Sequence, residues 1–389
     1  MILDKTILIS NVTIVNFDQA EFKGDLFIKN GKIERIGKKL LLESDRQIDG
    51  KFKEWIVFPG FIDMHMHGLA GFDTMDATEE TLRGMARSLV KEGTTSFLAT
   101  TMTQDIDRIE AALLNVRRFE YHADEAELLG VHLEGPFISK KWAGAQPIEH
   151  IMEPSIDQFN SWQQLSGNLI KQITVAPEVP NGFDFIKELN RQDVLVSIGH
   201  SNATATEVER AVQLGAKQCA HLFNQMRPFH HRELGVVGGV LLEERVKTEI
   251  IADFVHSHPD AIKMAYRLKK ASRIILITDA MRAKGLPYGN YDLGGQTVYV
   301  TENGAHLSTG ALAGSLLTMD QAVRNMQRVT GCSYQELVSM SSANAAKQLK
   351  LSNKGYIAEG VDADLVILDK ALHVQKTICR GNVVFDNDW

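Results

Sequence analysis

The sequence predicts an α/β fold: a (β/α)8 barrel with a small β-sandwich domain formed by the N- and C-terminal segments. Eight short apolar runs alternate with helical patterns through the middle of the 389-residue chain, and β-rich segments with glycine turns lie at both ends. In addition, five of the apolar runs stop at or beside a histidine or a carboxylate. Because the chemistry of such barrels lies at the C-terminal ends of their strands, this third pattern predicts where the functional site is.

The two ends of the chain carry strand signals. Residues 7–33 contain β-rich runs around an Asn-Gly pair, which is a strong hairpin signal. Residues 363–385 contain three further short runs with glycine turns. We expect these segments to pair into one β-sandwich domain over residues 1–56 and 356–389, which leaves residues 57–355 for the barrel.

Strand and helix patterns alternate between these ends. Helical patterns cover residues 79–91, 206–215 and 259–270, and they separate apolar runs that have the length of buried strands. Eight β–α units over roughly 290 residues fall within the usual size of such a barrel with insertions. The expected barrel strands are residues 56–64, 94–101, 128–134, 173–179, 194–200, 218–223, 249–254 and 274–279.

His65 and His67 follow the first of these runs. Alternate residues of a strand point to the same face, so both imidazoles are aimed at one point from one element. Imidazole is a good ligand for zinc, iron, cobalt or nickel. A His-x-His pair by itself is weak evidence, because two histidines in a half-exposed strand match it by chance.

Four further strand ends carry metal-competent or acid–base groups. The third run ends in Glu134, the fifth in His200 and the eighth in Asp279, and the sixth contains His221. Any one of them can be a satisfied polar group of the core. Five such endings in chain order favour a site, because burying an ionisable group costs several kcal/mol unless it is paired or coordinates a metal.

Together these side chains can hold one or two divalent ions. One set joins the two histidines of the first strand to Glu134 and Asp279, and the other joins Glu134 to His200 and His221, so that Glu134 bridges. Two metal ions about 3.5–4 Å apart can activate water and polarise a carbonyl oxygen. Zinc, iron, cobalt, nickel and manganese all suit these ligands. The six candidate ligands are His65, His67, Glu134, His200, His221 and Asp279.

Acid–base roles follow from the same strand ends. Asp279 can take a proton as water attacks and return it to a leaving amine. His256 follows the seventh strand and can donate to a substrate carbonyl as its oxygen becomes negative. His258 precedes Pro259, and we interpret it as a residue that begins a helix.

Two loops are candidates for substrate binding. Residues 224–233 contain Arg227, Arg232 and two histidines, which suit an anionic group such as phosphate. The same charges are also typical of a solvated surface loop. Residues 311–315 follow the eighth strand, and Gly314 allows a close approach of the backbone to a ligand, although a plain helix start explains this segment equally well.

Composition argues against several classes of protein. The formal net charge is −7 and no basic run stands out, which disfavours a nucleic-acid groove. Three unpatterned cysteines disfavour a disulfide framework and suit a reducing compartment. The sequence has neither a signal-peptide pattern nor an apolar stretch of the ~18 residues that a membrane span needs. We expect a cytoplasmic protein that acts on a small molecule.

The chain resembles the amidohydrolase superfamily nearly end to end. Residues 59–68 match the first-strand signature of the superfamily, and residues 360–366 match the segment in which the chain returns to the β-sandwich. Residues 132–136, 199–204 and 221–224 are similar to those of deacetylases that act on N-acetyl sugar phosphates. Dihydroorotase-like relatives use a carboxylated lysine where this chain has a glutamate, which disfavours them.

This resemblance implies hydrolysis of the acetamide of N-acetylglucosamine 6-phosphate to glucosamine 6-phosphate and acetate, in amino-sugar catabolism, by a metal-dependent homodimer. It implies metal ligation by Glu134, His200 and His221 and acid–base catalysis by Asp279. The chain has both first-strand histidines, and in this respect it resembles the branch of the family that binds two metals. The implied substrate contacts are Ala145, Gln146, Asn224, Gln225, Arg232, His256 and Leu312.

Two other functions stay open at this point. A related enzyme would act on N-acetylgalactosamine 6-phosphate or on an N-acyl amino acid, and the Arg232 loop favours a phosphate over a free amino acid. A non-catalytic scaffold on the same fold is the remaining alternative, since a fold alone does not prove a function. Such scaffolds lose ligands, whereas this chain keeps all six candidates.

Overall fold

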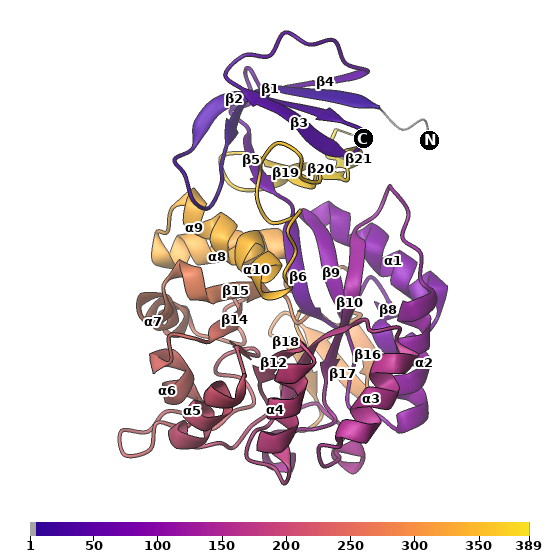
Figure 1. Cartoon of the computed structure of the whole chain (residues 1–389), viewed down its shortest axis with the longest axis vertical. Helices are drawn as coiled ribbons and strands as arrows, with labels where there is room; N and C mark the ends of the chain where they lie inside the picture. Colours follow the sequence, from indigo (N-terminus) through magenta and orange to yellow (C-terminus); the bar gives the residue numbers. More distant parts are fainter. Residues whose placement is uncertain (1–4, 389) are drawn as a thin grey trace.

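The computed structural model describes residues 5–388, and its larger part is a parallel barrel (Figure 1). The eight barrel strands follow one another in space in their chain order. Backbone hydrogen bonds from Asp279 N–H to the His65 carbonyl (2.8 Å) and from His67 N–H to the Ala280 carbonyl (2.9 Å) join the last strand end to the first. The predicted barrel is therefore confirmed. Its strands are β6 (Phe61–Met66), β9 (Thr94–Thr100), β10 (Glu127–Glu134), β11 (Ile170–Val175), β12 (Leu195–Ile198), β13 (Gln218–Cys219), β14 (Lys247–Ile251) and β15 (Ile274–Ile277).

The observed strands differ from the expected ones by one to four residues at their ends, and two of these differences have a clear physical cause. The run at 56–64 is two strands, β5 (Ile56–Pro59) and β6, separated by Gly60. A Cβ at Gly60 would lie 2.2 Å from Thr95 Oγ1, so only glycine fits where the chain passes into the barrel. The fourth strand ends at Val175 instead of residue 179. Pro177, which has no N–H for a ladder bond, explains that early end.

The second sheet unites the two ends of the chain and lies at the top of Figure 1. Its strand order is β21-β20-β19-β5-β1-β2-β3, and β4 pairs with β1. The Asn-Gly pair forms the predicted hairpin between β2 and β3. Antiparallel pairing of β5 with β19 brings Pro59 opposite Leu365. Besides β5, the strands are β1 (Thr6–Ile14), β2 (Phe22–Lys29), β3 (Lys32–Gly37), β4 (Arg46–Asp49), β19 (Leu365–Leu368), β20 (Val374–Cys379) and β21 (Asn382–Asp386).

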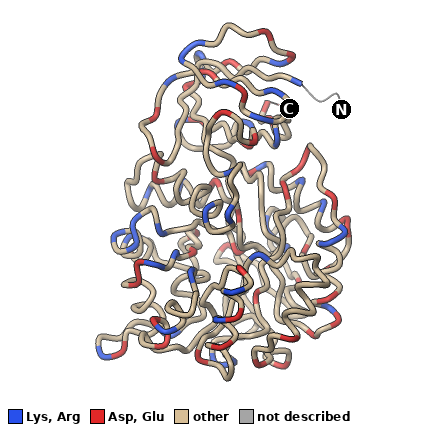
Figure 2. The backbone as a smooth tube through the Cα atoms, in the orientation of Figure 1, with Lys and Arg blue, Asp and Glu red and all other residues tan. Residues whose placement is uncertain are grey.

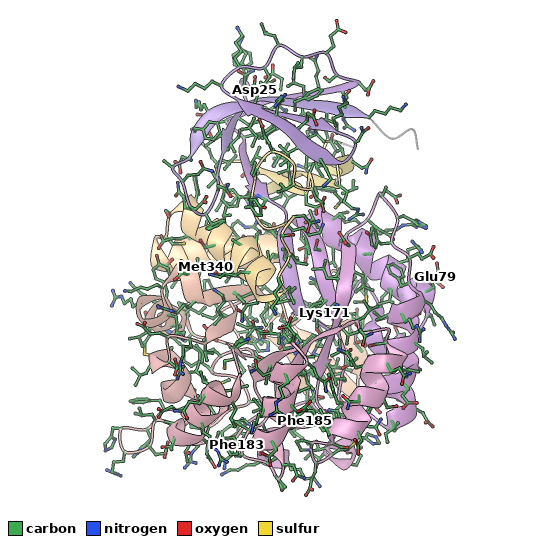
Figure 3. The ribbon with its side chains drawn as sticks, in the orientation of Figure 1. Asp25, Glu79, Lys171, Phe183, Phe185 and Met340 are labelled. Atoms are coloured by element: carbon green, nitrogen blue, oxygen red, sulfur yellow. The ribbon has the colours of Figure 1, made fainter. Side chains whose placement is uncertain are left out.

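Helices cover the outside of the barrel (Figure 1). The three helical patterns named from the sequence are confirmed as α1, α5 and α7. Each helix buries an apolar face on the barrel. For example, the ring of Phe185 on α4, labelled in Figure 3, packs edge-on against Phe137 at 5.0 Å between centroids. The helices are α1 (Glu79–Leu89), α2 (Ile106–Arg118), α3 (Ile156–Leu165), α4 (Gly182–Arg191), α5 (Ala205–Leu214), α6 (Gly235–Leu242), α7 (Pro259–Lys269), α8 (Met319–Thr330), α9 (Tyr334–Val338) and α10 (Asn344–Gln348).

A small antiparallel sheet follows the last barrel strand and was not expected from the sequence. It consists of β16 (Gly289–Leu293), β17 (Gln296–Thr301) and β18 (Gly304–Leu307). Residues 311–315 are not the start of a helix. They run back along this sheet, with a hydrogen bond from Ala313 N–H to the Ala305 carbonyl at 3.0 Å. A two-stranded ribbon, β7 (Gly68–Leu69) with β8 (Phe72–Asp73), directly follows the first barrel strand.

The surface carries charges of both signs. Lysine and arginine are interspersed with aspartate and glutamate throughout the described backbone (Figure 2). Within residues 5–388, no helix combines the length and the apolar character that a membrane crossing requires.

Candidate metal centre and active site

The six candidate ligands meet at the C-terminal ends of the barrel strands. They come from β6, β10, β12, β13 and β15 or from the residues that directly follow these strands, and all six side chains are buried. Glu134 lies at their centre. Its Oε1 is 3.2 Å from His65 Nε2, 3.3 Å from His200 Nε2 and 3.1 Å from His221 Nε2. Its Oε2 is 3.2 Å from His67 Nε2.

These separations are those expected between ligands of one ion. A tetrahedral zinc ion with bonds of roughly 2.0–2.1 Å keeps its ligand atoms about 3.3 Å apart. Asp279 Oδ1 is 3.4 Å from His67 Nε2 and 3.6 Å from His65 Nε2, close to the same spacing. Two overlapping trios have all their ligand atoms within 4.8 Å of one another, His65/His67/Asp279 and His65/Glu134/His221. The trio that the sequence suggested is equally compact, because Glu134 Oε1, His200 Nε2 and His221 Nε2 lie 3.1–3.3 Å from one another.

Hydrogen bonds on the far side of two rings fix which nitrogen faces the centre. His200 Nδ1 lies 2.9 Å from the Trp142 carbonyl, and His221 Nδ1 lies 3.2 Å from the Asn224 carbonyl. A carbonyl oxygen only accepts, so each Nδ1 carries the proton and each Nε2 keeps its lone pair. The two Nε2 atoms are 3.1 Å apart and both face Glu134. Lone pairs that converge on a carboxylate suit a bound cation.

The electrostatics of the cluster also favour positive charge. Burial lowers the pKa of His67, but hydrogen bonds to Asp279 and Glu134 outweigh it and raise that pKa to about 9. Burial raises the pKa of Glu134, but the surrounding imidazoles, with His65 the strongest, bring that pKa well below its usual value. The donor set of imidazole and carboxylate is one that divalent transition metals accept. The residues therefore fit a metal.

Three of these residues have unusual backbone conformations. His200, His221 and Asp279 adopt φ values of 46°, 26° and 48°, in the left-handed region that side-chain-bearing residues rarely occupy. Each lies two residues beyond the end of its strand. The surrounding structure holds them there; for example, the Asp279 carbonyl accepts from Ser315 N–H at 2.7 Å. Such strain concentrates at functional sites.

A cavity of about 220 Å³ opens beside Glu134 and Asp279. Of the residues expected to contact substrate, six line it: Ala145, Gln146, Asn224, Gln225, His256 and Leu312. Sequence reasoning missed Met102, Leu293 and Gly310 as lining residues. Met102 follows β9, whose end carries no charged residue or histidine that would indicate a site. Leu293 lies on β16, in the sheet that the sequence did not predict. The Gly294-Gly295 pair that turns β16 into β17 was the one available sign of that hairpin.

Two of the lining side chains are held in place by neighbours. Gln146 Nε2 donates to Glu134 Oε2 at 2.7 Å, and its Oε1 accepts from Thr103 N–H at 2.7 Å. His256 Nδ1 lies 2.7 Å from Asp253 Oδ2, and His256 N–H donates to Asp253 Oδ1 at 2.8 Å. Asp253 thereby fixes the ring orientation of His256, a role that the sequence did not suggest.

The basic loop after β13 is divided between the cavity and the surface. Asn224 and Gln225 line the cavity, whereas Arg232 is exposed, lies 2.8 Å from His231 Nε2 through its Nη1, and is not among the lining residues. Arg227 donates to the Asn202 carbonyl at 3.4 Å. His258 begins α7 as expected, with its ring accepting from Asp260 N–H.

A larger hollow of about 570 Å³ lies at the opposite end of the barrel. Residues near the N-terminal ends of β11 and β12 line it, among them Lys171, which is labelled in Figure 3. It contains none of the clustered metal-competent groups found at the other end. The smaller cavity is the candidate active site, because chemistry in this fold occurs at the C-terminal ends of the strands.

The fold and the histidine–carboxylate cluster define a metal-dependent barrel hydrolase. The chain belongs to the amidohydrolase family, whose profile matches residues 56–384. A relative from Lysinibacillus sphaericus named N-acetylglucosamine-6-phosphate deacetylase is 55% identical over 379 residues, 97% of each chain. The crystal structure of N-acetylglucosamine-6-phosphate deacetylase from Thermotoga maritima is 38% identical, covers 98% of this chain and all of its own, and superposes with a TM-score of 0.89. An N-acetylgalactosamine-6-phosphate deacetylase from Escherichia coli O157:H7 is 37% identical over 330 residues, 84% of this chain and 87% of its own.

Proposed function

We propose that this chain hydrolyses the acetamide of N-acetylglucosamine 6-phosphate and releases D-glucosamine 6-phosphate and acetate. The observation that carries the proposal is the 55% identity, over nearly the whole chain, to a relative named for that activity. The complete set of six buried candidate ligands, Glu134 and the five around it, supports catalysis over a scaffold role. One or two divalent ions, of zinc, iron, cobalt, nickel or manganese, would be held by the six residues.

We propose the following division of labour. When bound, the metal lowers the pKa of water and polarises the amide carbonyl. Asp279 accepts the proton of the attacking water at a carboxylate oxygen while the new C–O bond forms. It then delivers that proton to the amide nitrogen as the C–N bond breaks, so the amine leaves neutral. His256, oriented by Asp253, donates to the carbonyl oxygen as negative charge develops there.

Recognition of the sugar is assigned to the residues that line the cavity: Ala145, Gln146, Asn224, Gln225 and Leu312. Arg232 is the proposed phosphate contact, because it lies on the same loop as Asn224 and Gln225 and its guanidinium matches phosphate geometry. A charge-assisted hydrogen bond contributes typically ~1.5–3 kcal/mol, which corresponds to roughly 10–150-fold in affinity.

Replacement of Arg232 tests the phosphate contact. Arg232→Ala should lower kcat/KM for N-acetylglucosamine 6-phosphate by roughly 10–150-fold and should hardly change the low activity on unphosphorylated N-acetylglucosamine. Arg227→Ala, on the same loop, is the matched control and should have the smaller effect. Equal losses on both substrates would show that Arg232 supports the fold or a subunit contact and that the phosphate is held elsewhere.

The galactosamine epimer is the second candidate substrate, because a relative named for it is 37% identical. The two substrates differ at one hydroxyl, so one assay separates them. Acetate release should be measured on both N-acetylated hexosamine 6-phosphates, on N-acetylglucosamine and on an N-acetyl amino acid, using protein whose metal has been counted. Preference for N-acetylglucosamine 6-phosphate is expected, and full activity in thoroughly metal-free protein would refute the mechanism.

We also propose a cytoplasmic homodimer. The three cysteines are buried and unpaired, which suits a reducing compartment. Phe229 and Leu242 are 58% and 65% exposed, and large apolar side chains of this kind suit a protein contact. Light scattering at micromolar concentration measures the assembly directly.

A further inference from the structure

A carboxylate that no part of the proposed mechanism uses lies directly beneath the metal centre. Glu249 is on β14 and is fully buried inside the barrel. Among the described residues, its one ion-pair partner is His65, and neither lysine nor arginine pairs with it. A buried carboxylate is costly unless hydrogen bonds or a cation stabilise it. The contacts of Glu249 therefore indicate why this position carries a charge.

Glu249 accepts four hydrogen bonds, two on each oxygen. Its Oε1 accepts from Gln172 Nε2 at 2.7 Å and from Gln218 Nε2 at 2.6 Å. Its Oε2 is 2.8 Å from His65 Nδ1 and accepts from His221 N–H at 3.3 Å. An ionised carboxylate, which only accepts, satisfies all four donors. The two glutamines hold one oxygen, and the other oxygen is directed at two candidate metal ligands.

The contact with His65 selects the ligand atom of that ring. A proton on Nδ1 is donated to Glu249, so the lone pair is on Nε2, the nitrogen that faces Glu134 and Asp279. A carboxylate behind a histidine raises its basicity as a ligand and fixes its orientation. The ring is further confined by His132, whose ring packs edge-on at 4.4 Å between centroids.

The contact with His221 acts on the main chain. His221 has a φ of 26°, a strained value, and its N–H would be buried without a partner if Glu249 were absent. His65 and His221 come from two different strand ends, those of β6 and β13, and both face Glu134. One carboxylate therefore touches the ring of one candidate ligand and the backbone of another.

We propose that Glu249 is the positioning residue of the metal centre, which fixes His65 to bind through Nε2 and holds the His221 backbone in its strained conformation. It does not touch substrate. The inference rests on the proposed function, since it supposes that the six residues hold metal. The inference adds Glu249 to the site as a seventh residue, which acts through its contacts with two candidate ligands, His65 and His221.

The first test measures zinc affinity of the purified full-length protein by competition with a chelator. In Glu249→Gln, a single amide oxygen cannot serve four donors, so we expect zinc affinity at the His65 position to fall by roughly 10–100-fold, the usual effect of losing such a partner. The matched control is Gln348→Ala. Gln348 donates to Gln218 Oε1 at 3.1 Å, so it belongs to the same network without touching Glu249. We expect its zinc affinity to stay within about threefold of the unmodified protein.

The second test needs no variant, so it remains decisive if Glu249→Gln fails to fold. Long-range ¹H–¹⁵N spectra of zinc-loaded protein labelled at the histidine rings should show His65 with a proton on Nδ1 and zinc on Nε2. Coordination of His65 through Nδ1, or unchanged zinc affinity in Glu249→Gln, would overturn the inference. An equal loss in Gln348→Ala would also overturn it, because a merely structural network would then explain both. Failure of the unmodified protein to bind zinc, cobalt or iron would instead refute the proposed function.

Discussion

Asp279 is the residue on which the proposed chemistry depends most. Burial raises the pKa of Asp279, but the neighbouring imidazole of His65 and the hydrogen bond to His67 outweigh burial and bring that pKa below its usual value. The carboxylate is thus ionised at neutral pH and ready to accept a proton. Its backbone is fixed on both sides, by His65 at 2.8 Å and by Ser315 at 2.7 Å, so its position depends little on its own charge.

Replacement of this carboxylate by an amide should separate catalysis from folding. Asp279→Asn keeps the shape but cannot accept the proton, and positioned acid–base groups contribute roughly 10²–10⁴-fold to the rate. We expect kcat to fall by at least the upper part of that range, because Asp279 is also a candidate ligand, while the melting temperature and substrate affinity change little. Stopped assays of acetate release measure this. A loss of tenfold or less would move the proton relay to another group, with His256 the next candidate.

At the scale of elements, each half of the metal centre is tied to particular strands. β6 supplies His65 and leads into His67, whereas β12 and β13 lead into His200 and His221, and Glu134 at the end of β10 lies between them. Removal of the candidate ligands of one strand should therefore release the metal ion that they hold and leave the other metal ion bound at partial occupancy.

The first-strand histidines provide this test. His65→Ala and His67→Ala should each lower the metal content from two ions toward one, and the ion that stays should be the one near His200 and His221. Conversely, His200→Ala or His221→Ala should lose metal and activity together. Metal counting by mass spectrometry, alongside the rate, decides the matter. Wild-type metal content and rate in both first-strand variants would mean that these histidines are structural.

Much of this element-level organisation could be predicted from the sequence, because it depends on local patterns. The period of two placed His65 and His67 on one face, and the strand ends identified Glu134 and Asp279. Non-local contacts could not be predicted in this way. The close approach of Thr95 to Gly60 interrupts the first apolar run. Glu249 lies at the start of an expected strand, and nothing in the local sequence indicates the four groups that donate hydrogen bonds to it. Arg232 was expected near the substrate from its charge, which carries no information about where its loop lies.

At the scale of the whole molecule, a buried cluster of one lysine and two carboxyl groups joins distant segments of the chain. Lys284, which follows β15, donates to Glu92 Oε1 at 2.9 Å, and both side chains are nearly inaccessible to solvent. The same lysine stabilises Asp63 on β6 through its charge. One cation therefore serves two buried carboxyl groups. Burial raises the pKa of Glu92 to about 7, and the positive charge of Lys284 offsets this shift only in part.

This raised pKa predicts a pH dependence of folding stability. The carboxyl of Glu92 titrates near 4.5 when exposed and at about 7 in the fold, so between these values the folded protein holds a proton that the unfolded chain releases. The stabilising contribution is complete below about pH 4.5 and is lost as the pH rises through 7. Urea unfolding at pH 5.5 and pH 8 should therefore show a stability difference that is smaller in Glu92→Gln, whose amide can still accept from Lys284 but does not titrate. Groups that do not interact with Glu92, such as Asp73, titrate in both proteins and cancel in the comparison. An identical pH dependence in the two proteins would mean that Glu92 stays ionised in the fold and that Lys284 alone is sufficient to hold its charge.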